Sequence, residues 1–238
     1  MAFFRGDVYS YSLDKMTPLA VYLPWDDQRR LQSQEAPKTL VLLHGLEGNG
    51  SYWSRYSSAE RYAQAHNLAL VMPEAEMSMY ADMRYGQNYA QYIGVELKQI
   101  IDSLFRLQTN RDNFFIAGLS MGGYGALRMA LTYPEQFSRC ASFSGALMLG
   151  SQDYLTELAA WQDPGRSAPY DEAYELQRSL YFGCRSAYGE NFTYNPSNDL
   201  LALAKKALAS GLPLPEILLT CGTEDILYDV NRHYCQAF

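Results

Sequence analysis

Five short runs of uninterrupted apolar residues divide the chain from residue 40 onwards. They lie at residues 40–43, 68–72, 114–117, 140–143 and 217–219. Runs of this length suit β-strands that are covered on both faces, because a half-exposed strand would alternate apolar and polar residues. The sequence therefore predicts a mostly parallel sheet buried between two layers of helices.

The segments between these runs carry helical patterns. In the clearest one, a single stripe of a helix holds Ile93, Leu97, Ile100, Ile101 and Leu104. Residues 59–65, 123–131 and 200–209 give further helices. Strands that alternate with helices predict right-handed crossovers, and hence a three-layer α/β fold with helices on both faces of the sheet.

Three segments depart from this alternation. Residues 9–13 and 19–23 alternate in polarity on either side of an expected turn at 14–17, which predicts an N-terminal antiparallel hairpin. Residues 28–38 are polar and are expected to form a loop. Residues 146–212 are rich in Tyr, Asp, Pro and Ser, with short amphipathic pieces at 154–161 and 172–180. We expect them to form a cap-like insertion over the carboxyl edge of the sheet, within one domain that spans residues 1–238.

A serine stands where one of the predicted strands meets a predicted helix. Residues 118–122 read Gly-Leu-Ser-Met-Gly, the GxSxG pattern, after the apolar run 114–117 and before the helical stretch 123–131. A serine on a tight strand-to-helix turn has a strained backbone, and side chains two residues away on either side would collide with it. Gly118 and Gly122 remove those side chains. The pattern predicts Ser120 as a nucleophile, against the alternative of a glycine-rich turn with an incidental serine.

Two other loops are expected near Ser120. The run 40–43 leads into His44-Gly45-Leu46, and we expect the backbone amides of Leu46 and Met121 to form an oxyanion hole. The run 217–219 leads into residues 221–225, where Asp225 is the preferred acid to orient a histidine. Glu224 and Asp229 are weaker candidates, and an aspartate in this place could equally cap a helix.

Four segments carry a resemblance to a known family: HGLEGNGSYW at 44–53, AGLSMGGYGAL at 117–127, ASFSGAL at 141–147 and CGTEDILYD at 221–229. Together they resemble the tributyrin-esterase and esterase D family, which includes S-formylglutathione hydrolases and is related to feruloyl esterases and mycolyltransferases. The resemblance implies an α/β-hydrolase fold and hydrolysis of short acyl esters by a Ser-His-Asp triad with no cofactor. It supports Ser120, Asp225 and the amides of Leu46 and Met121 position by position.

The family's triad histidine has no match in the printed sequence. In the family it follows the aspartate by one helix and one further strand, and we expect the protein to continue beyond Phe238 with that strand and helix and to supply the histidine there. The chain has three histidines. His44 is expected to stabilise its turn, and His66 to end a helix far from Ser120. His233 could act as the base only on an unusually placed helix.

Composition narrows the partners of this chain. A formal net charge of −7 argues against binding to nucleic acid. No apolar run is long enough to cross a membrane, and no secretory signal opens the chain, so a cytoplasmic protein is expected. The four cysteines lack CxxC spacing, which argues against a zinc or redox site, and Cys140 and Cys221 are expected to be buried free thiols.

The expected substrate is a small acyl ester or thioester. Trp53 and Tyr85 are candidate substrate contacts, although each is more often ordinary packing. Two other functions stay open: an acyltransferase that uses the same serine, and a catalytically silent binding protein with this fold. Association into a homo-oligomer also stays open.

Overall fold

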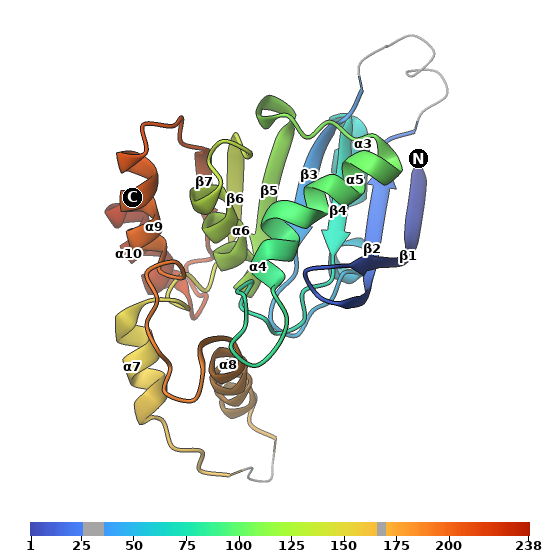
Figure 1. Ribbon diagram of the computed structural model, residues 1–238. Coiled ribbons are helices and arrows are strands. Elements are labelled where there is room, and N and C mark those ends of the chain that lie inside the picture. Colours follow the sequence, from blue (N-terminus) through green and yellow to red (C-terminus); the bar gives the residue numbers. More distant parts are fainter. Residues whose placement is uncertain (26–35, 166–169) are drawn as a thin grey trace.

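In the computed structural model, residues 1–25, 36–165 and 170–238 are described. They form a seven-stranded sheet with the strand order β1-β2-β4-β3-β5-β6-β7 (Figure 1). Strands β3 to β7 run parallel to one another, and β2 pairs antiparallel with both β1 and β4. The strands are β1 Ala2–Ser10, β2 Lys15–Leu23, β3 Lys38–Leu43, β4 Leu68–Pro73, β5 Phe114–Leu119, β6 Arg139–Phe143 and β7 Glu216–Thr220. The prediction of a mostly parallel sheet is confirmed.

Helices pack on both faces of this sheet. Successive side chains of a strand point to opposite faces, so alternate residues belong to two separate core clusters. Val41 and Ile116 belong to a core cluster with Ile101 of α5 (Leu97–Phe105) and Leu127 of α6 (Met121–Thr132). The alternate side chains, such as Leu42 and Leu70, pack with Ala63 of α3 on the opposite face. The helical elements are α2 Tyr52–Tyr56, α3 Ala59–Ala65, α4 Tyr89–Gln91, the π-helix η1 Tyr92–Glu96, α5 Leu97–Phe105, the 3-10 helix η2 Arg111–Asn113, α6 Met121–Thr132, α7 Gln152–Ala160, α8 Glu172–Tyr188, α9 Leu200–Ala209 and α10 Tyr228–Ala237.

Most of the elements predicted from apolar periodicity are confirmed. The five strands lie on the five apolar runs, and α3 and α9 have the predicted bounds. The helix predicted around Ile93 contains the π-helical turn η1 ahead of α5. Leu104, expected on its buried stripe, is 62% exposed in the last turn of α5, just before the left-handed Arg106, with φ 50°.

The N-terminal hairpin is present, but its predicted bounds were wrong. Strand β1 begins at Ala2, and the turn lies at residues 11–14, between the paired residues Ser10 and Lys15. Tyr11 and Leu13 therefore lie in the turn, although their polarity continues the alternation of the strand. Much of β1 is exposed at the edge of the sheet and gives no alternating signal of its own. The expected loop at 28–38 lies largely outside the described residues.

A carboxylate from η1 fastens the hairpin turn to the helical layer. Glu96 accepts hydrogen bonds from the Ser10 hydroxyl at 2.6 Å and from the Tyr11 and Ser12 amides at 2.7 and 3.0 Å. Burial raises the pKa of Glu96, but these hydrogen bonds outweigh it and lower the pKa. The charged carboxylate thus satisfies three donors of a turn that has no strand partner.

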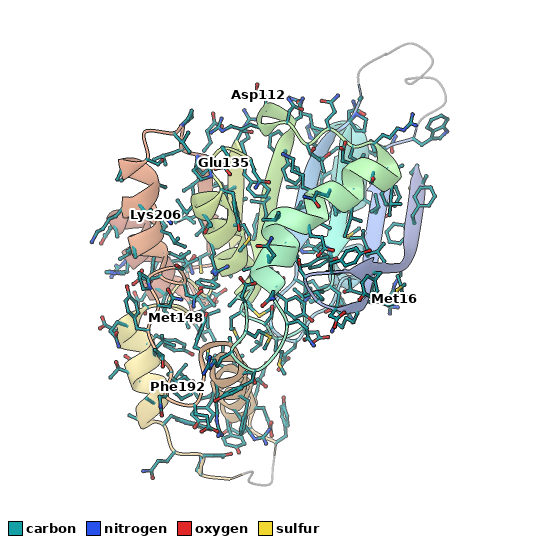
Figure 2. The ribbon with its side chains drawn as sticks, viewed as in Figure 1. Met16, Asp112, Glu135, Met148, Phe192 and Lys206 are labelled. Carbon is teal, nitrogen blue, oxygen red and sulfur yellow. The ribbon has the colours of Figure 1, made fainter. Side chains whose placement is uncertain are left out.

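Residues 146–212 contribute to two places in the fold. Helices α7 and α8 lie beyond the carboxyl ends of the parallel strands (Figure 1), whereas α9 packs on α6 in the helical layer and leads into β7. Figure 2 shows side chains filling the space between helices and sheet, with Asp112, just before β5, at one end and Met148, after β6, towards the other. Among the described residues, no helix has the length and apolar character of a membrane span.

Candidate active site

Ser120 occupies the turn between β5 and α6 in a strained backbone conformation. Its φ of 55° and ψ of −118° fall outside the helical and strand regions. The Ser120 amide donates to the Phe143 carbonyl at 3.0 Å, and its carbonyl accepts the Gly123 amide at 2.9 Å. The side chain is partly exposed. Bonds to both neighbouring elements therefore hold the hydroxyl at the carboxyl edge of the sheet while leaving it open to a ligand.

Glycines on either side of Ser120 make this turn sterically possible. A β-carbon at Gly118 would collide with the Gly122 carbonyl group, and one at Gly122 would lie 2.7 Å from the His44 carbonyl oxygen. At Gly123 it would lie 2.9 Å from the Gly145 α-carbon. Real β-carbons do not approach so closely, so larger residues at these three positions would force the turn apart.

The loop after β3 lies directly beside Ser120. A β-carbon at Gly45 would be only 3.5 Å from the Ser120 β-carbon. Within the described residues, the Leu46 amide has no hydrogen-bond acceptor. Met121 is the first residue of α6, so its amide has no partner within the helix, and the positive end of the helix dipole lies there. Two backbone amides without an acceptor in the described structure thus belong to the segments that adjoin Ser120, the loop after β3 and the start of α6.

Asp225 is the most enclosed of the three candidate acids. It is half-buried after β7, while Glu224 and Asp229 are exposed. Its Oδ1 accepts the Leu227 amide at 2.8 Å in the turn that precedes α10. Hydrogen bonds from the Ser144 hydroxyl, the Leu227 amide and the Cys221 thiol lower the pKa of Asp225, although burial opposes them. The carboxylate therefore both shapes this turn and stays charged near neutral pH.

None of the three histidines hydrogen-bonds to Ser120 or Asp225. His44 is buried, with Nδ1 2.8 Å from the Gly45 carbonyl oxygen and Nε2 accepting the Ala75 amide at 3.0 Å. The expectation that it stabilises its turn is confirmed. His66 ends α3 at the opposite end of the parallel strands. His233 is exposed on α10, where its ring contacts that of Tyr234.

A cavity of about 570 Å³ opens beside Ser120. Its lining includes Tyr52 and Tyr56 of α2, and Leu176 of α8, but neither Trp53 nor Tyr85, the two candidate substrate contacts. The Trp53 indole donates to the Leu43 carbonyl at 3.0 Å and lines a separate groove of about 1020 Å³ on the α3 face of the sheet. Tyr85 is 59% exposed on a segment whose backbone bonds to α8.

Sequence reasoning missed Tyr52 and Leu176. The motif at 44–53 ends in Tyr52 and Trp53, so Tyr52 could have been a candidate as well as Trp53. Adjacent residues of a helix point about 100° apart, and because Trp53 faces the sheet, Tyr52 is the one that reaches the cavity. Leu176 gave no signal, since its place depends on how α8 docks.

Cys140 is buried as expected, but Cys221 is only partly buried, because it lies just past the end of the edge strand β7. In the described part of the chain, no group of three or more His, Cys, Asp or Glu side chains could hold a metal ion.

A parallel sheet with covered faces, a strained serine between strand and helix and free amides beside it define an α/β-hydrolase. The "Putative esterase" family model matches residues 10–207, and the chain belongs to this esterase family. It is a carboxylic-ester hydrolase, and the resemblance to the esterase D family is confirmed.

Three relatives illustrate the similarity. The acetyl esterase of Caldicellulosiruptor saccharolyticus is 31% identical, over 98% of this chain and 84% of that protein. The substrate-bound structure of FphF, a fluorophosphonate-binding serine hydrolase of Staphylococcus aureus, is 31% identical with a TM-score of 0.76, over 99% of this chain and 84% of its own. The S-formylglutathione hydrolase FrmB of Staphylococcus aureus is 31% identical with a TM-score of 0.74, over 99% of this chain and 85% of its own.

Proposed function

We propose that this protein hydrolyses short-chain acyl esters or thioesters through an acyl-enzyme on Ser120. The observation that carries the proposal is the placement of the strained, partly exposed Ser120 beside the unused amides of Leu46 and Met121. An amide pair in this position stabilises the negative oxygen that forms when a hydroxyl adds to a carbonyl carbon.

The reaction has two steps. The Ser120 oxygen attacks the ester carbonyl carbon and gives its proton to a base, and the Leu46 and Met121 amides hold the resulting oxyanion. The oxyanion collapses, the carbon–oxygen bond to the alcohol breaks, and the alcohol leaves with the proton from the base. Water then attacks the acyl-enzyme in the same way and releases the acid.

In this scheme Asp225 orients an imidazole that serves as the base and stabilises its charged form. His44, His66 and His233 do not occupy that place. Free imidazole should therefore raise the rate of Ser120-dependent acylation of the printed chain. The rate of p-nitrophenyl acetate cleavage with Ser120→Ala at the same imidazole concentration measures the uncatalysed background. An imidazole effect of equal size in both proteins would contradict the proposed role of the base.

The cavity and the relatives support a short acyl group. Tyr52, Tyr56 and Leu176 bound the space beside Ser120, and the relatives include an acetyl esterase and an S-formylglutathione hydrolase. Rates with p-nitrophenyl esters from acetate to octanoate, and with the matching thioesters, would rank the substrates. We expect the shortest acyl groups to give the highest kcat/KM, and a maximum at octanoate would overturn this part of the proposal.

A second candidate is a silent hydrolase-fold protein that binds esters without cleaving them. It is favoured by one observation, the lack of a hydrogen bond between Asp225 and any of the three histidines. A fluorophosphonate probe separates the two functions. Labelling that Ser120→Ala abolishes supports the esterase, whereas equal labelling of both proteins supports the silent binder.

A cytoplasmic location is part of the proposal. All four cysteines are free thiols, two of them buried, as is usual in a reducing compartment. Cell fractionation of the natural host tests it, and recovery of the protein outside the cytoplasmic fraction would contradict it.

A further inference from the structure

The carbonyl group of His44 is held from several sides. The Tyr80 hydroxyl donates a hydrogen bond to the His44 oxygen at 2.8 Å. The first turn of α6 lies against the same oxygen, since a β-carbon at Gly122 would be 2.7 Å away. The His44 ring is itself fixed between the Gly45 carbonyl and the Ala75 amide. The peptide that leads into the loop beside Ser120 therefore has little freedom to rotate.

We propose that Tyr80 is a positioning residue for the oxyanion hole: its hydroxyl fixes the His44 carbonyl and thereby aims the Leu46 amide at the acyl carbonyl held by Ser120. The inference rests on the proposed function, which assigns the Leu46 amide and Ser120 their roles. Tyr80 acts through the backbone of residues 44–46 and does not line the cavity beside Ser120. Its contribution is to the geometry of the transition state, because an oxyanion donor must stand about 3 Å from the place where the charge develops.

The backbone around Tyr80 is strained and firmly held. Met79 and Tyr80 have φ values of 53° and 49°, in the left-handed region that non-glycine residues seldom adopt. The Tyr80 amide donates to the Ser78 hydroxyl at 3.1 Å, and its carbonyl accepts from the Arg128 guanidinium at 2.8 Å. Such strain persists only where the surrounding structure imposes it. The hydrogen bonds to Ser78 and Arg128 therefore hold Tyr80 in a strained backbone conformation.

Helix α6 couples Tyr80 to the nucleophile. The Tyr80 ring packs against Gly125, where a β-carbon would lie 2.5 Å from the Tyr80 Cγ. Ser120, Gly125 and Arg128 thus belong to one turn and helix that hold the nucleophile at one end and Tyr80 further along. A shift of α6 would move the serine and the support of the oxyanion loop together, which keeps their relative position constant.

The phenol stays a hydrogen-bond donor across the working pH range. Tyr80 is fully buried. Burial, together with the nearby charge of Glu74, raises its pKa well above the ordinary value, although the hydrogen bond to His44 opposes this. Protonation of the base, rather than ionisation of Tyr80, should therefore govern the pH profile.

The test compares Tyr80→Phe with Tyr22→Phe. Tyr22 is also fully buried, and its hydroxyl donates one hydrogen bond, to Gln64 Oε1 at 2.7 Å, between β2 and α3. Each variant removes the hydroxyl of a buried tyrosine and the hydrogen bond that it donates; because the Tyr22 bond is only partly buried, thermal unfolding of both variants is measured beside the rates. We expect Tyr80→Phe to lower kcat for p-nitrophenyl acetate by about tenfold with KM within twofold, because the lost geometry matters in the transition state. Tyr22→Phe should keep the kcat of the unaltered protein.

Hydrogen–deuterium exchange provides a readout that does not depend on turnover. The amides of residues 44–48 should exchange faster in Tyr80→Phe than in Tyr22→Phe, with the rest of the sheet unchanged. Unchanged exchange of this loop, or a fall in kcat of equal size in both variants, would overturn the inference. Failure of the proposed function would give a different result, because the unaltered protein would then show no Ser120-dependent turnover. In that case the exchange comparison by itself would still test whether Tyr80 holds the loop at residues 44–48.

Discussion

A β-carbon on Gly122 would lie 2.7 Å from the carbonyl oxygen of His44. The first turn of α6, which follows Ser120, therefore touches the segment that leads into Gly45 and Leu46, with no space for a side chain between them. The position of Ser120 relative to the loop after β3 depends on this backbone contact.

Gly122→Ala should disrupt the site and lower stability. The added methyl group must displace the Leu43 or His44 peptide, and such overpacking typically costs about 1–3 kcal/mol. We expect a lower midpoint of thermal unfolding and the loss of serine-dependent fluorophosphonate labelling. Gly6→Ala in β1 is the matched control, because its β-carbon meets nothing within 4 Å. Normal labelling of Gly122→Ala would mean that the contact is dispensable.

Asp225→Asn should reduce turnover while the fold is retained. The amide oxygen of asparagine can still accept the Leu227 hydrogen bond, but the negative charge that orients and stabilises the base is gone. In a well-studied triad the same change costs about 10⁴-fold in kcat, and we expect a loss on the order of a thousandfold in any form of the protein in which an imidazole serves as the base. Asp229→Asn should leave kcat unchanged, since that side chain is 87% exposed. An equal effect of the two substitutions on steady-state rates would exclude Asp225 as the acid.

Glu74→Gln should lower the free energy of unfolding at neutral pH and make that free energy depend less on pH under acidic conditions. Burial raises the pKa of Glu74, yet its contact with the His44 ring and hydrogen bonds from the Glu76 and Gly50 amides bring the pKa down to about 2. A lowered pKa stabilises the folded state above the ordinary value near 4.5, and this contribution disappears as pH falls from there towards 2. It amounts to about 3 kcal/mol at most.

Urea unfolding at several pH values between 7 and 3 measures this dependence. The gap in unfolding free energy between the unaltered protein and Glu74→Gln should close as the pH falls. Glu76→Gln serves as the control, because the Glu76 side chain is 53% exposed. A gap that stays constant with pH would show that the charge of Glu74 does not matter.

Leu176→Ala should shift the preference towards longer acyl groups. The side chain reaches the cavity beside Ser120 from α8, and removing it opens room for additional methylene groups. Each methylene is worth about 1–3 kcal/mol of discrimination, so kcat/KM for the hexanoate ester should rise about tenfold relative to acetate. Leu208→Ala, at a 66% exposed position of α9, should leave the ratio unchanged. An unchanged ratio for Leu176→Ala would remove α8 from the acyl site.

The strands and the backbone of the site could be predicted because burial requires apolar runs and backbone strain requires glycines at fixed positions near by in the sequence. Strands β3 to β6 each carry a short apolar run because side chains pack against both of their faces, whereas in the edge strand β7 Leu218 is 57% exposed. Ser120 needs glycines at fixed spacing, and Leu46 and Asp225 follow strands whose carboxyl ends share one edge. Each of these requirements involves residues that lie no more than about ten positions apart, so a local pattern in the sequence is enough to find it.

Features that depend on docking could not be predicted in this way. The exposed strand β1 has little alternation, so its start at Ala2 was missed and its turn was shifted to later residues. The choice between Tyr52 and Trp53 depends on the rotation of a five-residue helix. Leu176 reaches the cavity across 56 residues of sequence from Ser120, and Tyr80 reaches His44 across 36. No local pattern encodes contacts of that range.

The Glu96 clasp on the hairpin turn has a consequence for biosynthesis. Its partners Ser10, Tyr11 and Ser12 leave the ribosome 84 to 86 residues before the carboxylate that will hold them. Contacts that close so long a stretch of chain form late and slowly. The turn of the first hairpin is therefore expected to stay unfastened during translation until η1 emerges, even where β2 has already paired with β4.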